Sequence, residues 1–230
     1  MSLAIIIPAL NEADNIGVML ESLQPMRARG VEVIVVDGGS RDATVALATA
    51  CADLVISSAA GRATQMNVGA AATDAEVLLF LHADCIAPAD ADARIIDALG
   101  TGHGWGRFNI RISGDHVMFG VISWFMNQRS RLTGIATGDQ GLFMTRQVYA
   151  AVGGFPAQPL MEDVEICKRL KRVGPPGPAA LSACITTSGR RWQRYGVWHT
   201  ILLMWRLRFQ YWRGTPVAQL HATYYGKSHG

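Results

Sequence analysis

The sequence of 230 residues lacks the features that mark several common protein classes. It has no run of about 18 to 20 apolar residues, so we expect no membrane-spanning helix. Its N-terminus has no basic segment and its first apolar run is broken at Pro8, which argues against a signal peptide. No Gly-x-Gly-x-x-Gly follows the first apolar run and no Gly-Lys-Ser/Thr is present, which argues against dehydrogenases and P-loop kinases.

Cysteine pairs and a strong net charge are also missing. The cysteines are Cys51, Cys85, Cys167 and Cys184. They form no Cys-x-x-Cys pair and no zinc-site spacing with histidine, so we expect reduced thiols in a cytoplasmic protein. Attachment to the surface of a membrane stays open. The net charge of +3 is too small to predict nucleic acid binding.

The charge that is present is unevenly distributed. The first hundred residues are acidic, whereas basic residues crowd the C-terminal part. These basic residues are Arg190, Arg191, Arg194, Arg206, Arg208, Arg213 and Lys227. We therefore expect an anionic partner to meet the C-terminal part.

Apolar runs alternate with helical patterns along the first part of the chain. The expected strands are residues 4–8, 31–36, 54–57 and 77–81, and the expected helices are 11–23, 41–51 (with Ser40 as N-cap) and 62–72. This alternation predicts an α/β fold with a mostly parallel central sheet flanked by helices. Further on we expect helices at 90–99, 117–131 and 162–173, the last one ended by Gly174-Pro175-Pro176, a strand at 107–112 and a polar loop at 138–141.

Acidic residues follow these apolar runs at the points where a parallel sheet would gather them. Glu12 follows the first run, Asp37 ends the second, and Asp84 follows the run at 77–81. Glu162 and Asp163 open a later helix. Any one of them could simply cap a helix or finish a turn. Because ligands of open α/β sheets bind outside the carboxyl ends of the strands, the whole set predicts a metal and nucleotide site.

The segment 195–213 carries a narrow aromatic stripe at helical spacing. The stripe consists of Trp198, Leu202, Trp205, Phe209 and Trp212, and it is flanked by His199, Arg206, Gln210 and Arg213. Aromatic residues beside arginines are typical of a helix that lies on anionic lipid. A core helix or a partner-binding helix is the alternative, because Leu203 and Leu207 make the opposite face apolar as well.

With these motifs placed, the chain resembles the family 2 glycosyltransferases, which are inverting enzymes of the GT-A fold. The resemblance covers residues 3–192 and rests on Ile7-Pro8-Ala9-Leu10-Asn11-Glu12, Val36-Asp37-Gly38-Gly39-Ser40-Arg41-Asp42, Gly61-Arg62-Ala63-Thr64-Gln65-Met66-Asn67, Leu81-His82-Ala83-Asp84, Gly138-Asp139-Gln140-Gly141 and Met161-Glu162-Asp163. The last two motifs resemble those of a bacterial subgroup of unassigned substrate. The resemblance implies a glycosyltransferase domain at 1–192, with a nucleotide-binding half (1–100) and an acceptor half (101–192). An amphipathic helical extension at 193–230 would follow it.

The resemblance also implies roles on the donor side. A nucleoside-diphosphate sugar would be the donor, and Arg62 would reach its sugar or diphosphate. The donor pocket would be formed by Pro8, Leu10, Glu12, Asp37, Gly39, Gln65, Asn67 and Ala83. Asp84 would hold a divalent cation, Mn²⁺ or Mg²⁺, that neutralises the diphosphate.

On the acceptor side, the resemblance implies that Asp163 is the general base that takes the proton of the acceptor hydroxyl, with Glu162 in support. The residues expected at the acceptor or its phosphate are Asp139, Gln140, Arg191 and Trp192. The acceptor is unknown, and a lipid-linked or hydrophobic one would suit the apolar C-terminal helix. That helix would also place the enzyme on the inner face of the cell membrane.

Two positions depart from the family pattern. The metal motif usually has an acid where this chain has His82, which can ligate Mn²⁺ or orient Asp84 but suits Mg²⁺ less well. Arg190-Arg191-Trp192 only approximates the Gln-x-x-Arg-Trp arrangement, and a basic turn with a buried tryptophan is the alternative. A sugar nucleotidyltransferase and a sugar-nucleotide or lipid-binding relic without turnover are the competing functions.

Overall fold

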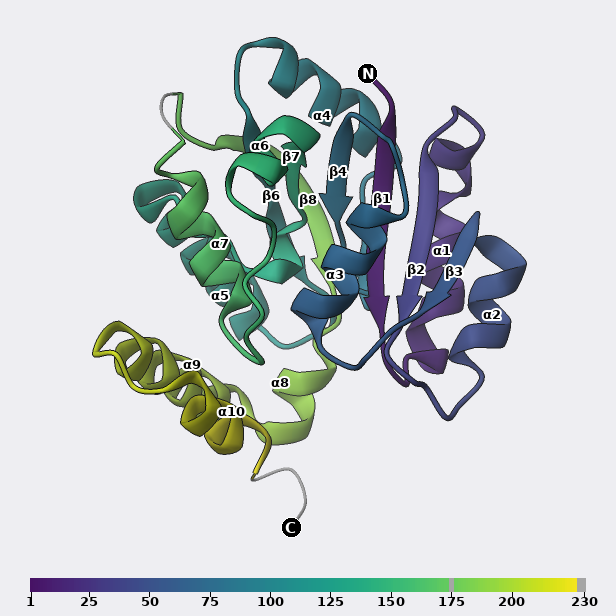
Figure 1. Cartoon of the computed structure of the whole chain (residues 1–230). Helices are drawn as coiled ribbons and strands as arrows, with labels where there is room; N and C mark the ends of the chain where they lie inside the picture. The colour runs from purple at the N-terminus through teal and green to yellow at the C-terminus, as the bar shows by residue number, and fades with distance from the viewer. Residues whose placement is uncertain (174–175, 227–230) are drawn as a thin grey trace.

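An eight-stranded mixed sheet lies at the centre of the computed structural model, which describes residues 1–173 and 176–226 (Figure 1). The strand order is β3-β2-β1-β4-β7-β6-β8-β5. The strands are β1 Leu3–Ala9, β2 Glu32–Asp37, β3 Leu54–Ser57, β4 Val77–Phe80, β5 Cys85–Ile86, β6 Trp105–Ile112, β7 Leu142–Thr145 and β8 Ala179–Thr187. The pairs β1–β2, β1–β4, β2–β3 and β6–β8 are parallel, whereas β7 is antiparallel to both of its neighbours and β5 is antiparallel to β8.

Helices cover both faces of this sheet. They are α1 Ala13–Arg27, α2 Thr44–Cys51, α3 Arg62–Ala71, α4 Ala91–Gly100, α5 Met118–Thr133, the 3₁₀ turn η1 Gly138–Gln140, α6 Arg146–Ala151, α7 Glu162–Leu170, α8 Arg190–Tyr195, α9 Val197–Trp212 and α10 Val217–Tyr225. Ile5 and Ile7 of β1 belong to a core cluster with α1 and α4, whereas Ile6 belongs to a second cluster with α3 and α7. Because β1 is buried on both faces, its sequence is continuously apolar.

The structure corrects several of the expected elements. Ser40 does not cap α2, which begins at Thr44; the Ser40 hydroxyl instead accepts a hydrogen bond from the Asn11 amide (2.8 Å). Residues 138–141 contain a 3₁₀ turn rather than an irregular loop. The sequence patterns missed β5, β7 and β8, and also α6 and α8. The helix expected at 162–173 ends at Leu170; Gly174 and Pro175 of its expected stop signal, like Lys227 of the basic set, lie outside the described residues.

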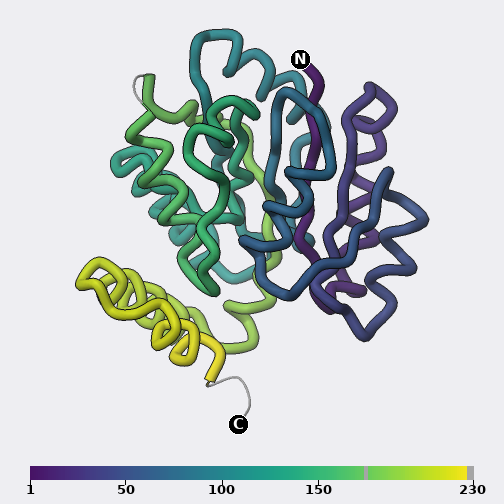
Figure 2. Tube along the Cα trace, viewed as in Figure 1, coloured from purple at the N-terminus to yellow at the C-terminus, as the bar shows by residue number. Residues whose placement is uncertain are grey.

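The C-terminal part folds into three helices that lie below α5 and α7 in the views of Figures 1 and 2. Leu207 of α9 and Leu220 of α10 are buried together with Met161 and Val164 at the start of α7. Val197 of α9 packs against α5 in a separate small cluster. Within the described residues, no helix has both the length and the apolar content that crossing a bilayer requires.

Candidate active site

The carboxyl ends of β1 and β2 form one wall of the candidate site. Asp37 ends β2 opposite Ala9 of β1, and its buried carboxylate accepts hydrogen bonds from the amides of Gly39 (2.9 Å) and Ser40 (3.0 Å). Gly39 has a φ of +94°, a conformation in which a side chain would be strained. The carboxylate therefore fixes the turn after β2, and its remaining lone pairs can still accept from a ligand.

Gln65 and Asn67 of α3 are both engaged with the protein itself. The Gln65 Nε2 donates to the carbonyls of Ala9 (2.8 Å) and Val36 (2.7 Å), which ties the ends of β1 and β2 together. Asn67 accepts from Tyr149 Oη (2.7 Å) and from the Phe155 amide, and donates to the Phe155 carbonyl. These bonds give both residues a positioning role, and their contact with a donor stays a prediction.

The other residues expected in the donor pocket differ in accessibility. Pro8 lies inside β1 and is buried, and the Ala83 side chain belongs to the core, so these two offer a ligand little more than backbone. Leu10 is exposed. Glu12 forms an ion pair with Arg190 of α8 (Oε2–Nη2, 3.3 Å), which joins the N-terminal half to the C-terminal helices.

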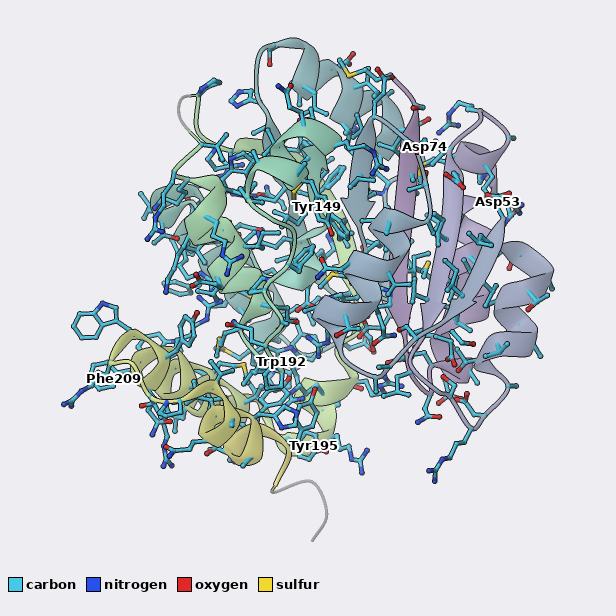
Figure 3. The ribbon with its side chains drawn as sticks, in the orientation of Figure 1. Asp53, Asp74, Tyr149, Trp192, Tyr195 and Phe209 are labelled. Atoms are coloured by element: carbon cyan, nitrogen blue, oxygen red, sulfur yellow. The ribbon has the colours of Figure 1, made fainter. Side chains whose placement is uncertain are left out.

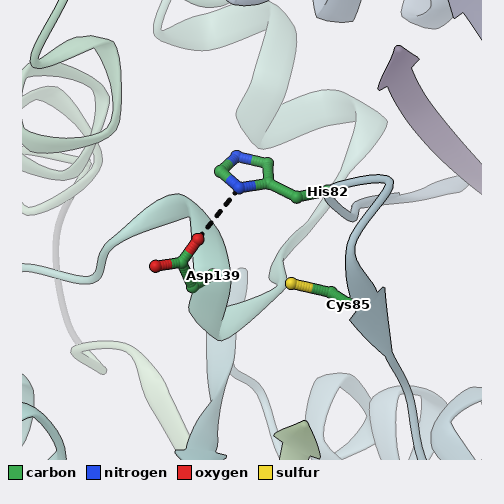
Figure 4. A group of neighbouring side chains, drawn as sticks. All are labelled: His82, Cys85 and Asp139. Atoms are coloured by element: carbon green, nitrogen blue, oxygen red, sulfur yellow. Dashed lines mark hydrogen bonds and ion pairs between the residues drawn. The ribbon is translucent and has the colours of Figure 1, made fainter. Parts of the chain in front are cut away.

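His82 meets Asp139 on the opposite side of the site (Figure 4). The His82 Nδ1 lies 3.0 Å from Asp139 Oδ1, and ligand atoms of His82, Asp139 and Cys85 all lie within 4.8 Å of one another. A Cβ on Gly138 would stand 2.3 Å from His82 Nε2, so the glycine is needed for the ring to pack here. The nitrogen and oxygen donors suit Mn²⁺, which fits the expectation for His82.

Electrostatics favour the charged forms of this pair. Burial lowers the pKa of His82, but the hydrogen bond and charge of Asp139 together with the charge of Asp84 raise it above its usual value. Burial raises the pKa of Asp139, but the His82 hydrogen bond and the charges of His82, Arg62 and Arg191 together lower it below its usual value. Burial raises the pKa of the Cys85 thiol, so it is a neutral group in the absence of a metal.

Asp84 lies next to this cluster but outside it. Its Oδ1 accepts a weak hydrogen bond from the Cys85 thiol (3.6 Å), and its backbone carbonyl accepts from the Ser188 amide. The structure thus pairs His82 with Asp139, which had been expected at the acceptor, rather than with Asp84. Metal binding by Asp84 stays a prediction.

Glu162 and Asp163 begin α7 directly after a strained residue. Met161 has a φ of +64°, which is unfavourable for a residue with a side chain, and it turns the chain so that both acids reach the site. Glu162 is buried, and Arg62 lies 3.6 Å from it (Nη1–Oε1). Burial, and after it the charge of Asp163, raise the pKa of Glu162, although Arg62 opposes them.

Asp163 is held by the turn that also carries Asp139. Its Oδ2 accepts from the Gly138 amide (3.2 Å) and its Oδ1 accepts from the Val164 amide (2.7 Å). A small cavity is lined by His82, Gly138, Glu162 and Asp163 together with apolar side chains. The predicted base and the predicted metal ligand therefore border the same space.

The remaining acceptor-side residues lie around this space. Gln140 is buried and donates to the Phe108 carbonyl and to Ser130 Oγ, so it serves the fold. Arg191 stacks on Tyr224 of α10 (3.9 Å to the ring centroid), and its buried Nε has no hydrogen-bond partner among the described residues. Trp192 is half-buried on α8, a helix rather than the basic turn of the alternative interpretation (Figure 3).

Sequence reasoning missed Cys85, the pairing of Asp139 with His82, and Arg129. Cys85 directly follows Asp84, but a lone cysteine carries no pattern. Arg129 lies in an apolar helical segment, and no periodicity distinguishes it from a solvated arginine.

Residues 4–150 match the model of the family described as Glycosyl transferase family 2. The chain belongs to this family. That membership and the GT-A fold were predicted and are confirmed, whereas the subgroup indicated by Gly138-Asp139-Gln140-Gly141 and Met161-Glu162-Asp163 stays a prediction. No curated protein matches the chain.

Several solved structures of low sequence identity share the fold. S. aureus TarS (residues 1–349) in complex with UDP has a TM-score of 0.66 and 17% identity, over 82% of this chain and 60% of that one. Glucosyl-3-phosphoglycerate synthase from Mycobacterium tuberculosis, with Mn²⁺, UDP and glucosyl-3-phosphoglycerate, has a TM-score of 0.60 and 20% identity, over 80% of this chain and 70% of that one.

The mannosyltransferase PcManGT from Pyrobaculum calidifontis, in complex with GDP-Man and Mn²⁺, has a TM-score of 0.63 and 20% identity, over 80% of this chain and 56% of that one. The chain spans about 60% of the length of the TarS 1–349 structures that it matches. The likeness to these three proteins is one of fold.

Proposed function

We propose that this protein is an inverting glycosyltransferase that moves a sugar from a nucleoside-diphosphate sugar to a hydroxyl group of an acceptor. The observation that carries the proposal is the convergence of Arg62, Glu162, Asp163, His82 and Asp139 on one side of a family 2 fold. This reaction needs a cation for the diphosphate (Arg62), an acid to hold that cation (Glu162), a base (Asp163) and donors for a metal ion (His82 and Asp139). The structural neighbours with UDP, UDP-GlcNAc or GDP-Man support this class of donor.

In the proposed mechanism, this chain's own residues bind, orient and move one proton. Arg62 binds the diphosphate or the sugar, since a guanidinium keeps its charge and matches phosphate oxygens. Asp163 Oδ2 takes the proton of the acceptor hydroxyl as the hydroxyl attacks the anomeric carbon, which inverts its configuration. Glu162 holds Arg62, and the bonds from Gly138 and Val164 fix the carboxylate of Asp163.

A divalent cation fits the nitrogen and oxygen donors of His82 and Asp139, which form one cluster with Cys85, and Asp84 lies next to that cluster. When bound, it would neutralise charge on the departing nucleoside diphosphate. Imidazole and carboxylate together favour Mn²⁺ over Mg²⁺. The structural neighbours with Mn²⁺ or Mg²⁺ support a cation of this kind.

Thermal-shift titration with UDP-, GDP- and dTDP-sugars in Mn²⁺, followed by transfer assays with the stabilising donor, tests this function. We expect one nucleotide class to stabilise the protein selectively. Binding without hydrolysis or transfer would favour a sugar-nucleotide or lipid-binding relic. Formation of a sugar nucleotide from a nucleoside triphosphate and a sugar phosphate would favour a nucleotidyltransferase.

We also propose that the enzyme works in the cytoplasm, on the inner face of the cell membrane. Its four cysteines are all free thiols, as a reducing compartment would keep them. The aromatic stripe of α9 is exposed, with Trp198, Trp205 and Trp212 between 67 and 80% accessible. Leu207, on the other face, is buried, so the stripe itself is free to meet lipid.

A further inference from the structure

Arg129 of α5 carries buried donors without a partner. Its Nε and Nη2 atoms are buried, and no acceptor among the described residues bonds to them. An unpaired donor of a buried charged group costs stability, so proteins rarely keep one unless a ligand or water completes it. The described residues supply no acceptor for these two donor atoms of Arg129, which leaves that role to a ligand or water.

The contacts of its neighbours place Arg129 beside the proposed base. The next residue, Ser130, accepts a hydrogen bond from Gln140 (3.0 Å), and the same turn holds Asp163 through the Gly138 amide. Leu207 of α9 and Val164 of α7 belong to one buried cluster. Asp163 and Cys167 of α7 and Arg208 of α9 all act electrostatically on the Arg129 guanidinium, so it lies near the junction of α5, α7 and α9.

Positive charge exceeds negative charge at this junction. Burial, together with the like charge of Arg208 on α9, lowers the pKa of Arg129 to about 10. Burial also lowers the pKa of Arg208. Asp163 is the acid whose charge opposes both shifts. Two guanidinium groups beside one carboxylate leave a surplus that an anionic ligand would neutralise.

The positive charge of Arg107 also lowers the pKa of Arg129, but Arg107 itself has hydrogen-bond partners. Its guanidinium donates to Asn109 Oδ1 and to the carbonyls of Phe108 and Asn127, so the fold satisfies it without a ligand. This part of the chain therefore supplies hydrogen-bond acceptors to a buried arginine that has only a structural role.

We propose that Arg129 and Arg208 bind a phosphate group of the acceptor and thereby hold the acceptor hydroxyl at Asp163. Phosphate offers several charged oxygens, which suits two guanidinium groups better than a single carboxylate would. The inference rests on the proposed function and names the class of its acceptor, a phosphate-bearing molecule. The acceptor is either a soluble sugar phosphate or a phosphate carried by lipid.

The full-length Arg129→Met variant tests the site, with Arg131→Met on the same helix as the matched control because Arg131 is exposed. We expect Arg129→Met to raise the melting temperature without ligand, since it removes unpaired buried donors. We also expect it to weaken stabilisation by inorganic phosphate about 10- to 150-fold, the usual range for a lost hydrogen bond to a charged group. A merely structural Arg129 would instead lower the melting temperature when replaced, and that result would overturn the proposal.

Phosphate can also occupy the donor site, so Arg62→Met is measured in parallel. If inorganic phosphate still raises the melting temperature of Arg129→Met but not that of Arg62→Met, phosphate binds at the donor site. That result would overturn the acceptor proposal. Metal-dependent UDP or GDP binding is measured separately on each variant. Intact nucleotide binding with no Arg129-dependent phosphate effect would sink the inference and leave the proposed function standing.

Two arms distinguish the sources of the phosphate. Protection by glucose 1-phosphate that depends on Arg129 would support a soluble acceptor. Binding to phosphatidylcholine vesicles with phosphatidic acid, reduced in Arg129→Met but not in Arg131→Met, would support a lipid-borne one. No dependence on Arg129 in either arm would contradict the proposal.

Discussion

Arg62 at the start of α3 and Glu162 at the start of α7 form an ion pair across the candidate site, with 3.6 Å between Nη1 and Oε1. Arg62 is partly exposed, whereas the Glu162 side chain is only 6% accessible. The buried acid therefore bears most of the desolvation cost, and its pKa is raised. A cation held at the crevice in this way can exchange the carboxylate for the phosphates of a donor.

Glu162→Gln should stabilise the protein at neutral pH. A carboxyl group whose pKa is raised by folding contributes stability below its ordinary pKa and loses it as the pH rises through the raised value. At pH 7 the glutamine should therefore raise the melting temperature by about 2–4 °C for each 1 kcal/mol gained, and this gain should vanish near pH 4. Calorimetry at both pH values, with the exposed Glu21→Gln as control, measures it. A lower melting temperature at pH 7 would contradict the prediction.

Nucleotide binding should depend on a divalent cation through Asp84. We expect UDP or GDP affinity to fall in EDTA, and Asp84→Ala to cost at least the 10- to 100-fold typical of losing a partner of a metal ligand. The exposed Asp74→Ala is the matched control. Isothermal titration in Mn²⁺, Mg²⁺ and EDTA measures the dependence. His82→Ala should abolish a preference for Mn²⁺, and equal affinity of the native protein in EDTA and Mn²⁺ would remove the metal from the mechanism.

The aromatic stripe of α9 should carry the protein to anionic vesicles. Replacing Trp198, Trp205 and Trp212 by serine should abolish flotation with such vesicles at low salt, and Arg206→Glu should weaken it at least fivefold, because each basic residue near an anionic surface contributes about 1 kcal/mol. Native binding should fall as salt rises. Serine at the exposed Val18 is the control. No flotation of the native protein at low salt would end the membrane proposal and favour a protein partner for the stripe.

The sequence predicted the first half of the fold because each parallel strand there is a short apolar run followed by a helix. It failed for β7 and β8, since Leu142–Thr145 and Ala179–Thr187 pair across long separations and show no regular alternation. Glu12, Asp37, Asp84, Glu162 and Asp163 stood out in the sequence because each follows a strand or opens a helix, and their roles stay predictions. The pairing of His82 with Asp139 was not predicted, because a loop and a 3₁₀ turn 57 positions apart in the sequence bring them together.

The aromatic stripe of α9 illustrates a different limit. Helical spacing predicted two apolar faces but left open which of them packs against the protein. The structure buries Leu207 and leaves Trp205 exposed, so the choice depended on the partners that α7 and α10 provide. No local pattern contains that information, because it is a property of the tertiary contacts.

Asp163 carries the central test of the mechanism. Asp163→Asn should lower the rate of transfer by about 10²- to 10⁴-fold if the residue is the general base, while leaving donor affinity nearly unchanged. Both oxygens of Asp163 accept backbone N–H bonds, so the amide of asparagine would face one donor and cost some stability. The melting temperature of the variant is therefore measured beside its kinetics.

Glu162→Gln makes the same chemical change one residue earlier and serves as the kinetic comparison. If Asp163 is the base, turnover should fall far more in Asp163→Asn than in Glu162→Gln, with UDP affinity retained in Asp163→Asn. If Asp163 only complements the dipole of α7, its loss should cost about 0.3 to 1 kcal/mol of stability and leave turnover almost intact. Near-native transfer by a folded Asp163→Asn would refute the assignment and turn attention to Glu162 and Asp139.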